Sequence, residues 1–381
     1  MERTIFSPDH LLFRESVRRF VVKEIVPNLE HWTLNGIVSR DIWNKAGENG
    51  LLAMAVPEQF GGVGQGDFLY NVIVNEEIAR TGRVGPAFSL HNDIVQPYFL
   101  RLCNDEQKKR WFPGLVSGEL ITAIALTEPN AGSDLAAMRT TATDEGDHFL
   151  LNGTKTFITN GILNDLVIVA ALTNRKAGKN SGFSLFVVER GMDGYNRGKK
   201  LAKIGQRLHD TSELFFNNVQ VPKRNLLGKY NFGFLHLMEN LPRERLSIAV
   251  RAMAATEQAL ELTVSYCQQR EASGYPIGKF QNSRFILAEM KTKITIGRAF
   301  VDRCLQEHVN GTLSGEEAAM AKWWCTELEN EVADRCLQLH GGYGCMLEHP
   351  IARAFLDARA ETIYGGTTEI MKEIIGRSMG F

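Results

Sequence analysis

The chain has 381 residues, more than one compact core usually fills, so we expect two or three packed subdomains. Lys and Arg number 43 against 44 Asp and Glu, and the resulting net charge of -1 argues against a nucleic-acid-binding protein. The longest clearly apolar run, Leu166 to Leu172, falls far short of the roughly 20 residues that a membrane span needs. These properties favour a soluble protein that is large enough to be an enzyme.

The first segment, residues 1–119, is predicted to be helical. From Ser7 onward, apolar residues such as Leu11, Val17 and Phe20 recur at helical spacing. The Gly-rich stretch Gly61–Gly66 ("GGVGQG") superficially matches a dinucleotide-binding loop. It follows no predicted strand, however, so we expect an ordinary loop there.

The middle segment, residues 120–229, is predicted to be antiparallel β. Short β-branched and aromatic runs such as "DLVIVAAL", "GFSLFVVER" and "SELFFNNVQVP" alternate with turn residues. Asn152 and Gly153 predict a type I′ hairpin turn. Phe157 and Thr159, two residues apart in "FITN", should lie on the same side of a strand. From its own surroundings alone, Phe157 would be expected in the core of the sheet.

The last segment, residues 230–381, returns to long helical patterns. Helices are predicted over residues 246–269, 285–308 and 315–339, with another after Gly366. Helices of this length are typical of a bundle. The predicted fold class is therefore α+β: an N-terminal all-α domain (1–119), a middle antiparallel β domain (120–229) and a C-terminal four-helix bundle (230–381).

The metal-binding residue types are scattered. The nine histidines show no paired spacing, and the six cysteines show no C-x-x-C motif, so we expect no metal site and free thiols in a reducing compartment. From Met1 the chain enters an amphipathic stretch without an apolar signal core or a basic transit segment. We expect a cytoplasmic bacterial protein, or a processed protein of the mitochondrial matrix.

Four motifs carry a resemblance to one family. "ALTEPNAGSD" (125–134), "NGTKTFITNG" (152–161), "QLHGGYG" (338–344) and "IYGGTTEIMKEIIGR" (363–377) resemble the acyl-CoA dehydrogenases, in that family's order and over essentially the whole chain. The motifs are most similar to the long-chain and isovaleryl-CoA branch. The resemblance implies a bound FAD and α,β-dehydrogenation of an acyl-CoA thioester. It also implies electron transfer to an electron-transferring flavoprotein, and a site built by a homodimer, usually within a homotetramer.

The resemblance assigns a set of residues to FAD. The loop "TEPNAGSD" offers backbone N–H groups, the hydroxyls of Thr127 and Ser133, and close approach at Gly132. Phe157 would cover the isoalloxazine ring, and Thr159 would bond near its reactive edge. Taken alone, the loop reads as an ordinary turn. The full implied set is Leu126, Thr127, Gly132, Ser133, Phe157, Thr159, Arg270, Gln281, Gln338, Gly342, Thr367 and Glu369.

Six members of this set come from the C-terminal segment, among them Arg270, Gln338 and Gly342. Arg270 would clamp the FAD pyrophosphate, because a forked guanidinium suits phosphate oxygens. Ser273 stands where the family commonly has an aromatic residue, which is a departure from its pattern. Gln338 and Gly342 match positions that reach the FAD across the dimer interface. Without the family, Arg270 would be a solvated cation, and Gln338 and Gly342 would be a helix C-cap.

The catalytic base requires a separate assignment. Most family members place a Glu directly after Ile-Tyr, where this chain has Gly365, which cannot be a base. Either the enzyme is dead or repurposed, or the base comes from elsewhere. The long-chain and isovaleryl branches use a Glu before an Arg in the helix that opens the bundle, and Glu244 and Arg245 match that place. The interval from Arg245 to Arg270 is 25 residues (270 - 245), as the family requires.

The resemblance leaves Gly365 a role through its backbone. In the family this N–H, together with a ribityl hydroxyl of FAD, holds the thioester oxygen. Substrate contacts are implied for Ser133, Arg245 and Tyr364. A buried Glu244 should have a raised pKa, although "RER" alone would indicate a surface carboxylate. Acyl chain length stays open, as do two alternatives: a flavin oxidase that reacts with oxygen, and a non-catalytic acyl-CoA-binding protein.

Overall fold

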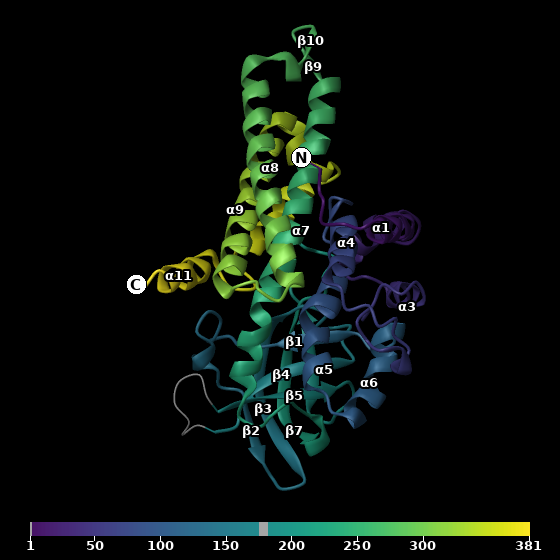
Figure 1. Cartoon of the computed structure of the whole chain (residues 1–381), viewed down its shortest axis with the longest axis vertical. Helices are drawn as coiled ribbons and strands as arrows, with labels where there is room; N and C mark the ends of the chain where they lie inside the picture. The colour runs from purple at the N-terminus through teal and green to yellow at the C-terminus, as the bar shows by residue number, and fades with distance from the viewer. Residues whose placement is uncertain (1, 175–181) are drawn as a thin grey trace.

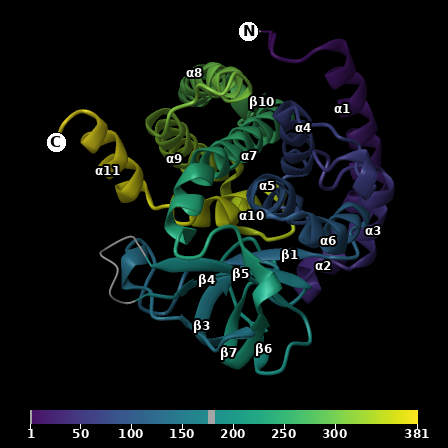
Figure 2. The ribbon, with the colours of Figure 1, turned by 60° about the horizontal axis from the view of Figure 1, so that its bottom comes forward.

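The computed structural model describes residues 2–174 and 182–381. Figure 1 shows the long helices of the C-terminal bundle running upward from the β-sheet, with the N-terminal helices packed along one side. Figure 2 shows the sheet from its own end, with α5 and α6 against it. The predicted α+β class is confirmed.

The N-terminal segment is helical, as predicted. Capping boxes at Ser7 and Asn104 fix two helix starts, because each side chain accepts a hydrogen bond from the backbone N–H three residues later. A π-helix, η4 (Leu90–Val95), runs directly into α5. Residues 61–66 form a loop without helix or strand, also as predicted. The helices are α1 (Pro8–Phe20), α2 (Leu29–Asn35), α3 (Asp41–Glu48), α4 (Phe68–Ala79), α5 (Gln96–Leu102) and α6 (Asp105–Ser117).

The middle segment forms one sheet, and its strands within the described residues are β1 (Thr122–Ala125), β2 (Thr141–Asp144), β3 (His148–Ile158), β4 (Leu166–Leu172), β5 (Phe183–Glu189), β6 (Tyr195–Lys200), β7 (Ser212–Pro222) and β8 (Leu226–Leu227). Their order is β6-β7-β3-β2-β4-β5-β8, with β1 beside β4. Pairing is mostly antiparallel, but β4 is parallel to β1 and β2. Strand β4 is buried on both faces, which explains its unbroken apolar run.

The predicted hairpin turn at Asn152 and Gly153 is wrong. Both residues lie inside β3, and the turn that joins β2 to β3 contains Gly146 instead. At Gly153 the pairing of β3 with β7 shifts register, and an added Cβ would lie 2.4 Å from Oγ1 of Thr140. The glycine therefore permits a close approach within the sheet and does not mark a turn.

The bundle contains α7 (Gly233–Gln269), α8 (Gln281–Val309), α9 (Gly315–His340) and α10 (Pro350–Ala358), while α11 (Thr368–Ser378) projects from its side (Figure 1). The predicted start of α7 at Leu246 is wrong: the helix begins at Gly233 and continues through Pro242. With 37 residues it is about 55 Å long. Its far end meets a small hairpin of β9 (Glu271–Ala272) and β10 (Tyr275–Pro276), whose turn residues Ser273 and Gly274 both have positive φ.

Two further findings concern the described part of the chain. None of its helices is both long and apolar enough to cross a lipid bilayer. It also contains no group of three or more His, Cys, Asp or Glu side chains arranged to hold a metal ion.

Candidate active site

Glu244 lies in α7, two residues after Pro242, and its side chain is buried. The hydroxyl of Tyr98 donates a hydrogen bond to its Oε1 at 2.8 Å. Burial raises the pKa of Glu244 to about 7, against the opposing effects of the Tyr98 hydrogen bond and the Arg245 charge. The interpretation as a surface carboxylate is therefore wrong. A carboxyl group with a pKa near neutrality is suited to general-base chemistry.

Gly365 packs against the same face of α7. Glu244, Ile248 and Arg251 are spaced by four and then three residues, so they lie along one side of the helix. Gly365 has a φ of 65°, and an added Cβ would lie 2.3 Å from Cδ1 of Ile248. The loop of Gly365 thus contacts α7 one turn beyond Glu244, which brings the two predicted catalytic positions into one region.

Arg251 anchors the residues that precede Gly365. Its guanidinium donates a hydrogen bond to the Tyr364 hydroxyl at 3.0 Å and forms an ion pair with the fully buried Glu361. Gln206, from the loop before β7, also donates to the Tyr364 hydroxyl, at 3.3 Å. Just beyond, Lys322 of α9 donates to the carbonyl of Gly366 at 2.7 Å. The loop is therefore held by α7, by α9 and by the β domain.

We expect Arg251→Met to destabilise the fold strongly. Removing this guanidinium leaves the carboxylate of Glu361, which has no exposed surface, without its ion-pair partner. Breaking one side of a buried pair costs about 3–5 kcal/mol. Urea unfolding measures this loss, and the double variant Arg251→Met with Glu361→Gln should recover most of it. A single variant as stable as the native protein would contradict the pairing.

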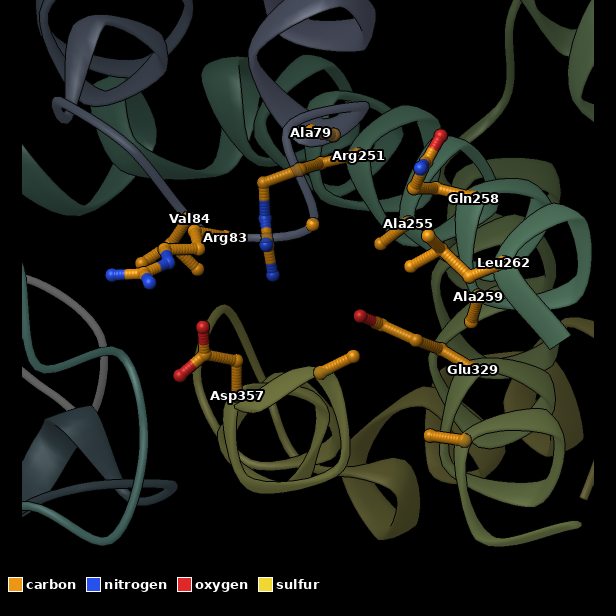
Figure 3. Close-up of a pocket in the computed structure, with 13 residues that line it drawn as sticks. Ala79, Arg83, Val84, Arg251, Ala255, Gln258, Ala259, Leu262, Glu329 and Asp357 are labelled. Atoms are coloured by element: carbon orange, nitrogen blue, oxygen red, sulfur yellow. The ribbon is translucent and has the colours of Figure 1, made fainter. Parts of the chain in front are cut away.

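A small cavity lies further along α7. Figure 3 shows Arg251, Glu329 and Asp357 around it. Burial raises the pKa of Glu329 to about 8 and also raises the pKa of Asp357. The cavity has a volume of about 20 Å³, which is room for one water molecule, so it cannot hold an acyl chain.

Arg245 is a buried cation next to the predicted base. It is buried, its charge acts on Glu244, and its Nε has no hydrogen-bond partner among the described residues. An unpaired buried donor costs free energy unless a ligand or water satisfies it. The contact of Arg245 with substrate stays a prediction.

Phe157 is not in the sheet core. Its side chain is 68% exposed and its φ is 60°, within a register shift between β3 and β7. The bulge also breaks the simple alternation that would have placed Phe157 and Thr159 on one side of a regular strand, because β3 ends at Ile158. A positive φ is strained for a bulky residue, and such strain is concentrated at functional sites. The chain presents an uncovered aromatic ring here.

The "TEPNAGSD" loop lies beside Phe157. The backbone N–H of Thr156 donates to the carbonyl of Thr127 at 2.9 Å, and the buried Lys155 donates to the carbonyl of Leu126 at 3.0 Å. Gly132 and Ser133 are exposed, and an added Cβ at Gly132 would meet nothing within 4 Å. An exposed ring next to an open loop fits the planar ring of a flavin.

This end of β3 is also linked to the Gly365 loop. Ile158 pairs with Ser212, the first residue of β7, and the segment just before β7 carries Gln206, which reaches Tyr364. Thr367 caps α11 by accepting a hydrogen bond from the N–H of Ile370 at 3.3 Å, and Glu369 is exposed in its first turn. The end of β3 is thus connected to the Gly365 loop through the segment from Gln206 to Ser212.

The other predicted FAD residues lie at the far end of the bundle. Arg270 is 26 residues beyond Glu244 (270 - 244), which is about 39 Å along a helix. The Tyr266 hydroxyl donates to the carbonyl of His340 at 3.2 Å, so the ends of α7 and α9 meet there (Figure 1). One chain does not bring this group to Phe157. Its members are Arg270, Gln281, Gln338 and Gly342, all exposed.

Sequence reasoning missed three residues around the base. Ile248 and Arg251 could have been found from their helical spacing to Glu244. Tyr98 carries no such signal, because it lies 146 residues away in the chain and in a different segment. Only the packing of α5 against α7 brings it to Glu244.

Family models match nearly the whole chain. The acyl-CoA dehydrogenase N-terminal, middle and C-terminal domains match residues 7–119, 123–219 and 231–380. The mitochondrial long-chain specific acyl-CoA dehydrogenase of Sus scrofa is 51% identical over 378 residues, covering 99% of this chain and 88% of that protein. The mitochondrial isovaleryl-CoA dehydrogenase of Solanum tuberosum is 35% identical, covering 98% and 91%.

A solved structure agrees with these matches. The acyl-CoA dehydrogenase of Geobacillus kaustophilus has a TM-score of 0.97 and 47% identity, with 100% of each chain covered. The predicted resemblance to the long-chain and isovaleryl-CoA branch is confirmed. The chain belongs to the acyl-CoA dehydrogenase family of flavoprotein oxidoreductases.

Proposed function

We propose that this chain oxidises an acyl-CoA thioester to the trans-2-enoyl-CoA, with Glu244 removing the α-proton. The observation that carries the proposal is the pairing of a buried Glu244, with a pKa raised to about 7, and a Gly365 loop packed one turn away on α7. A base elsewhere than position 365 explains how a family member can lack the usual Glu after Ile-Tyr.

The proton step sets a pH dependence. An α-proton of a thioester is weakly acidic, so the base must be ionised and close to the carbon. Glu244 is protonated below its pKa of about 7 and ionised above it. The rate of the chemical step should therefore rise with pH through about 7 and level off at higher pH.

The negative charge that develops on the thioester oxygen needs a donor. We assign this role to the backbone N–H of Gly365, because preorganised donors stabilise such charge most strongly. The anchoring of Tyr364 by Arg251 and of the Gly366 carbonyl by Lys322 supports this assignment, since both bonds limit movement of the loop. Tyr364, Arg245 and Ser133 are proposed to contact the substrate.

The proposed cofactor is FAD, which when bound supplies the acceptor for the hydride that leaves the β-carbon. Phe157 would cover one face of its ring, and Thr159, Leu126, Thr127, Gly132 and Ser133 would surround the ring with Thr367 and Glu369. Arg270, Gln281, Gln338 and Gly342 would bind its phosphates and far end from a second chain, because the distance along α7 excludes the same chain. A homodimer, alone or within a homotetramer, follows from this arrangement.

The proposed substrate class is long-chain acyl-CoA, and the proposed electron acceptor is an electron-transferring flavoprotein. The 51% identity to a long-chain specific enzyme supports the first, against 35% to an isovaleryl-CoA enzyme. The second rests on family resemblance.

Anaerobic mixing of the flavin-loaded protein with acyl-CoA thioesters tests the proposal. We expect rapid loss of flavin absorbance with long straight-chain thioesters and slower loss with short, medium or branched ones. Absence of bleaching across the whole panel would favour the non-catalytic acyl-CoA-binding alternative. Steady peroxide formation in air, without an electron-transfer protein, would instead favour the oxidase alternative.

A further inference from the structure

The environment of the Glu244 carboxylate is asymmetric. Among the described residues, Tyr98 supplies the one side-chain hydrogen bond to Glu244, and it goes to Oε1 at 2.8 Å. Tyr98 is fully buried, and burial raises the pKa of its phenol well above 10. The hydroxyl therefore stays protonated at any working pH and must act as a donor to the carboxylate.

Asn240 lies one helical turn before Glu244 in α7 and also acts on Tyr98, since it lowers the pKa of the tyrosine against the effect of burial. The side-chain amide of Asn240 donates a hydrogen bond to the carbonyl of His236 at 3.5 Å. The bond from Tyr98 to Oε1 is therefore the direct contact with the base.

The backbone that carries Tyr98 is also unusual. Helix α5 follows the π-helix η4 directly, with Pro97 near its start. π-helical turns are rare and often occur at functional sites. Tyr98 comes from the N-terminal segment, whereas Glu244 and Gly365 come from the C-terminal one. The hydrogen bond from Tyr98 to Glu244 therefore joins these two segments at the base.

We propose that Tyr98 is the positioning residue for the base: its hydroxyl holds Oε1 of Glu244 and leaves Oε2 to take the substrate α-proton. This inference rests on the proposed function, because it needs Glu244 to be the base. Tyr98 does not touch the reacting carbon in this account. It fixes the rotamer of the carboxylate and favours the ionised form that can accept a proton.

Other charged groups also lie near the base. The charge of Arg245, the next residue of α7, acts on Glu244, and the charges of Arg245 and of Lys322 in α9 act on each other. From η4, the carboxylate of Asp93 accepts hydrogen bonds from Ser247 and Asn71. The Arg243 charge acts on Asp93. Removal of the Tyr98 hydroxyl leaves all of these charges unchanged, so a change in titration can be assigned to the lost bond.

The test is Tyr98→Phe in the flavin-loaded protein. A hydrogen bond to a charged group favours the ionised form, so its loss should move the midpoint of the pH profile for flavin reduction upward by about one to two pH units. The rate on the plateau should fall about 10-fold from the loosened rotamer, while FAD content and thioester affinity stay unchanged.

Tyr195→Phe is a matched control. The Tyr195 hydroxyl is also buried and donates a 2.8 Å hydrogen bond, to Oδ1 of Asn164 in the β domain. Its removal therefore breaks a comparable buried hydrogen bond without changing the contacts of Glu244. This variant should keep the native pH midpoint. Infrared titration of the protonated carboxyl band, assigned by its loss in Glu244→Gln, follows the same midpoint without substrate.

The outcomes separate this inference from the proposed function. Upward shifts of both the kinetic and infrared midpoints in Tyr98→Phe, but not in Tyr195→Phe, support the positioning role. Unshifted midpoints with bound FAD overturn it, whatever the stability of the variant. If the infrared midpoint moves while Glu244→Gln still reduces flavin at the native rate, Glu244 is not the base, and both proposals fail.

Discussion

Glu244→Gln should lower the rate of flavin reduction by acyl-CoA about 10³-fold while leaving FAD bound. A general base typically contributes 10²–10⁴-fold, and glutamine keeps the size of the side chain but cannot accept the α-proton. The residues proposed to hold FAD lie elsewhere, so the yellow colour should persist. Single-turnover mixing under anaerobic conditions measures the chemical step directly and avoids any dependence on the electron acceptor.

The stability of this variant provides an internal check. The folded-state pKa of Glu244, about 7, lies above its ordinary value of 4.5, so the ionised side chain destabilises the fold as pH rises through this range. Glutamine resembles the protonated form. At pH 8 the variant should therefore be more stable than the native protein, by about 3 kcal/mol in the free energy of unfolding. A loss of activity cannot then be attributed to unfolding.

Glu329→Gln is the matched control for the base. Glu329 is another buried glutamate whose pKa is raised by burial, but it comes from α9 and lines the small cavity beside Asp357. It should retain flavin reduction near the native rate. Equal losses in Glu244→Gln and Glu329→Gln would indicate a general effect of buried carboxylates and would contradict the assignment of Glu244 as the base.

The fold class could be predicted from the sequence because it depends mainly on local hydrophobic periodicity and on turn residues. The helix over α9 begins at Gly315 as expected, where Ser314 and Glu317 form a capping box. Local signals failed where tertiary packing overrides them. Asn152 and Gly153 have the composition of a hairpin turn but lie within β3, and α7 continues through Pro242, which a local pattern would place at a helix end.

The candidate site was predictable only in part. Glu244 and Gly365 were identified from family motifs, and their proximity depends on Ile248, which a helical wheel could have indicated. Phe157 was assigned to FAD by resemblance alone. Its exposure results from a bulge with positive φ, which strand alternation cannot predict. Tyr98 was missed because a contact between α5 and α7 has no trace in local sequence.

Arg270→Gln should weaken FAD binding and abolish most flavin reduction in the proposed homo-oligomer. A forked guanidinium on pyrophosphate makes charge-assisted bonds, and their loss should weaken FAD retention about 10- to 100-fold. Arg270 directly follows α7, about 39 Å along that helix from Glu244. If each FAD is held by two chains, Arg270 and Glu244 of one chain serve different sites.

Mixed oligomers test this arrangement. A chain with Glu244→Gln and a chain with Arg270→Gln, carrying different affinity tags, are produced together and purified through both tags. In a mixed dimer one site receives both changes and the other receives neither. Although each variant alone is nearly inactive, the mixed dimer should recover about half of the native rate per chain, and a tetramer that also contains unmixed dimers should recover less.

Glu244→Gln mixed with Phe157→Ala is the control. In the proposed arrangement, Glu244 and Phe157 of one chain serve the same site. Every site in this mixed dimer therefore carries one of the two defects, and the activity should not exceed that of the single variants. If the Arg270→Gln mixture also stayed inactive, with both tags present and FAD supplied in excess, each site would have to belong to a single chain. Recovery in the first mixture and none in the second would establish that FAD bridges two chains, and would explain why one chain separates its cofactor residues by the length of α7.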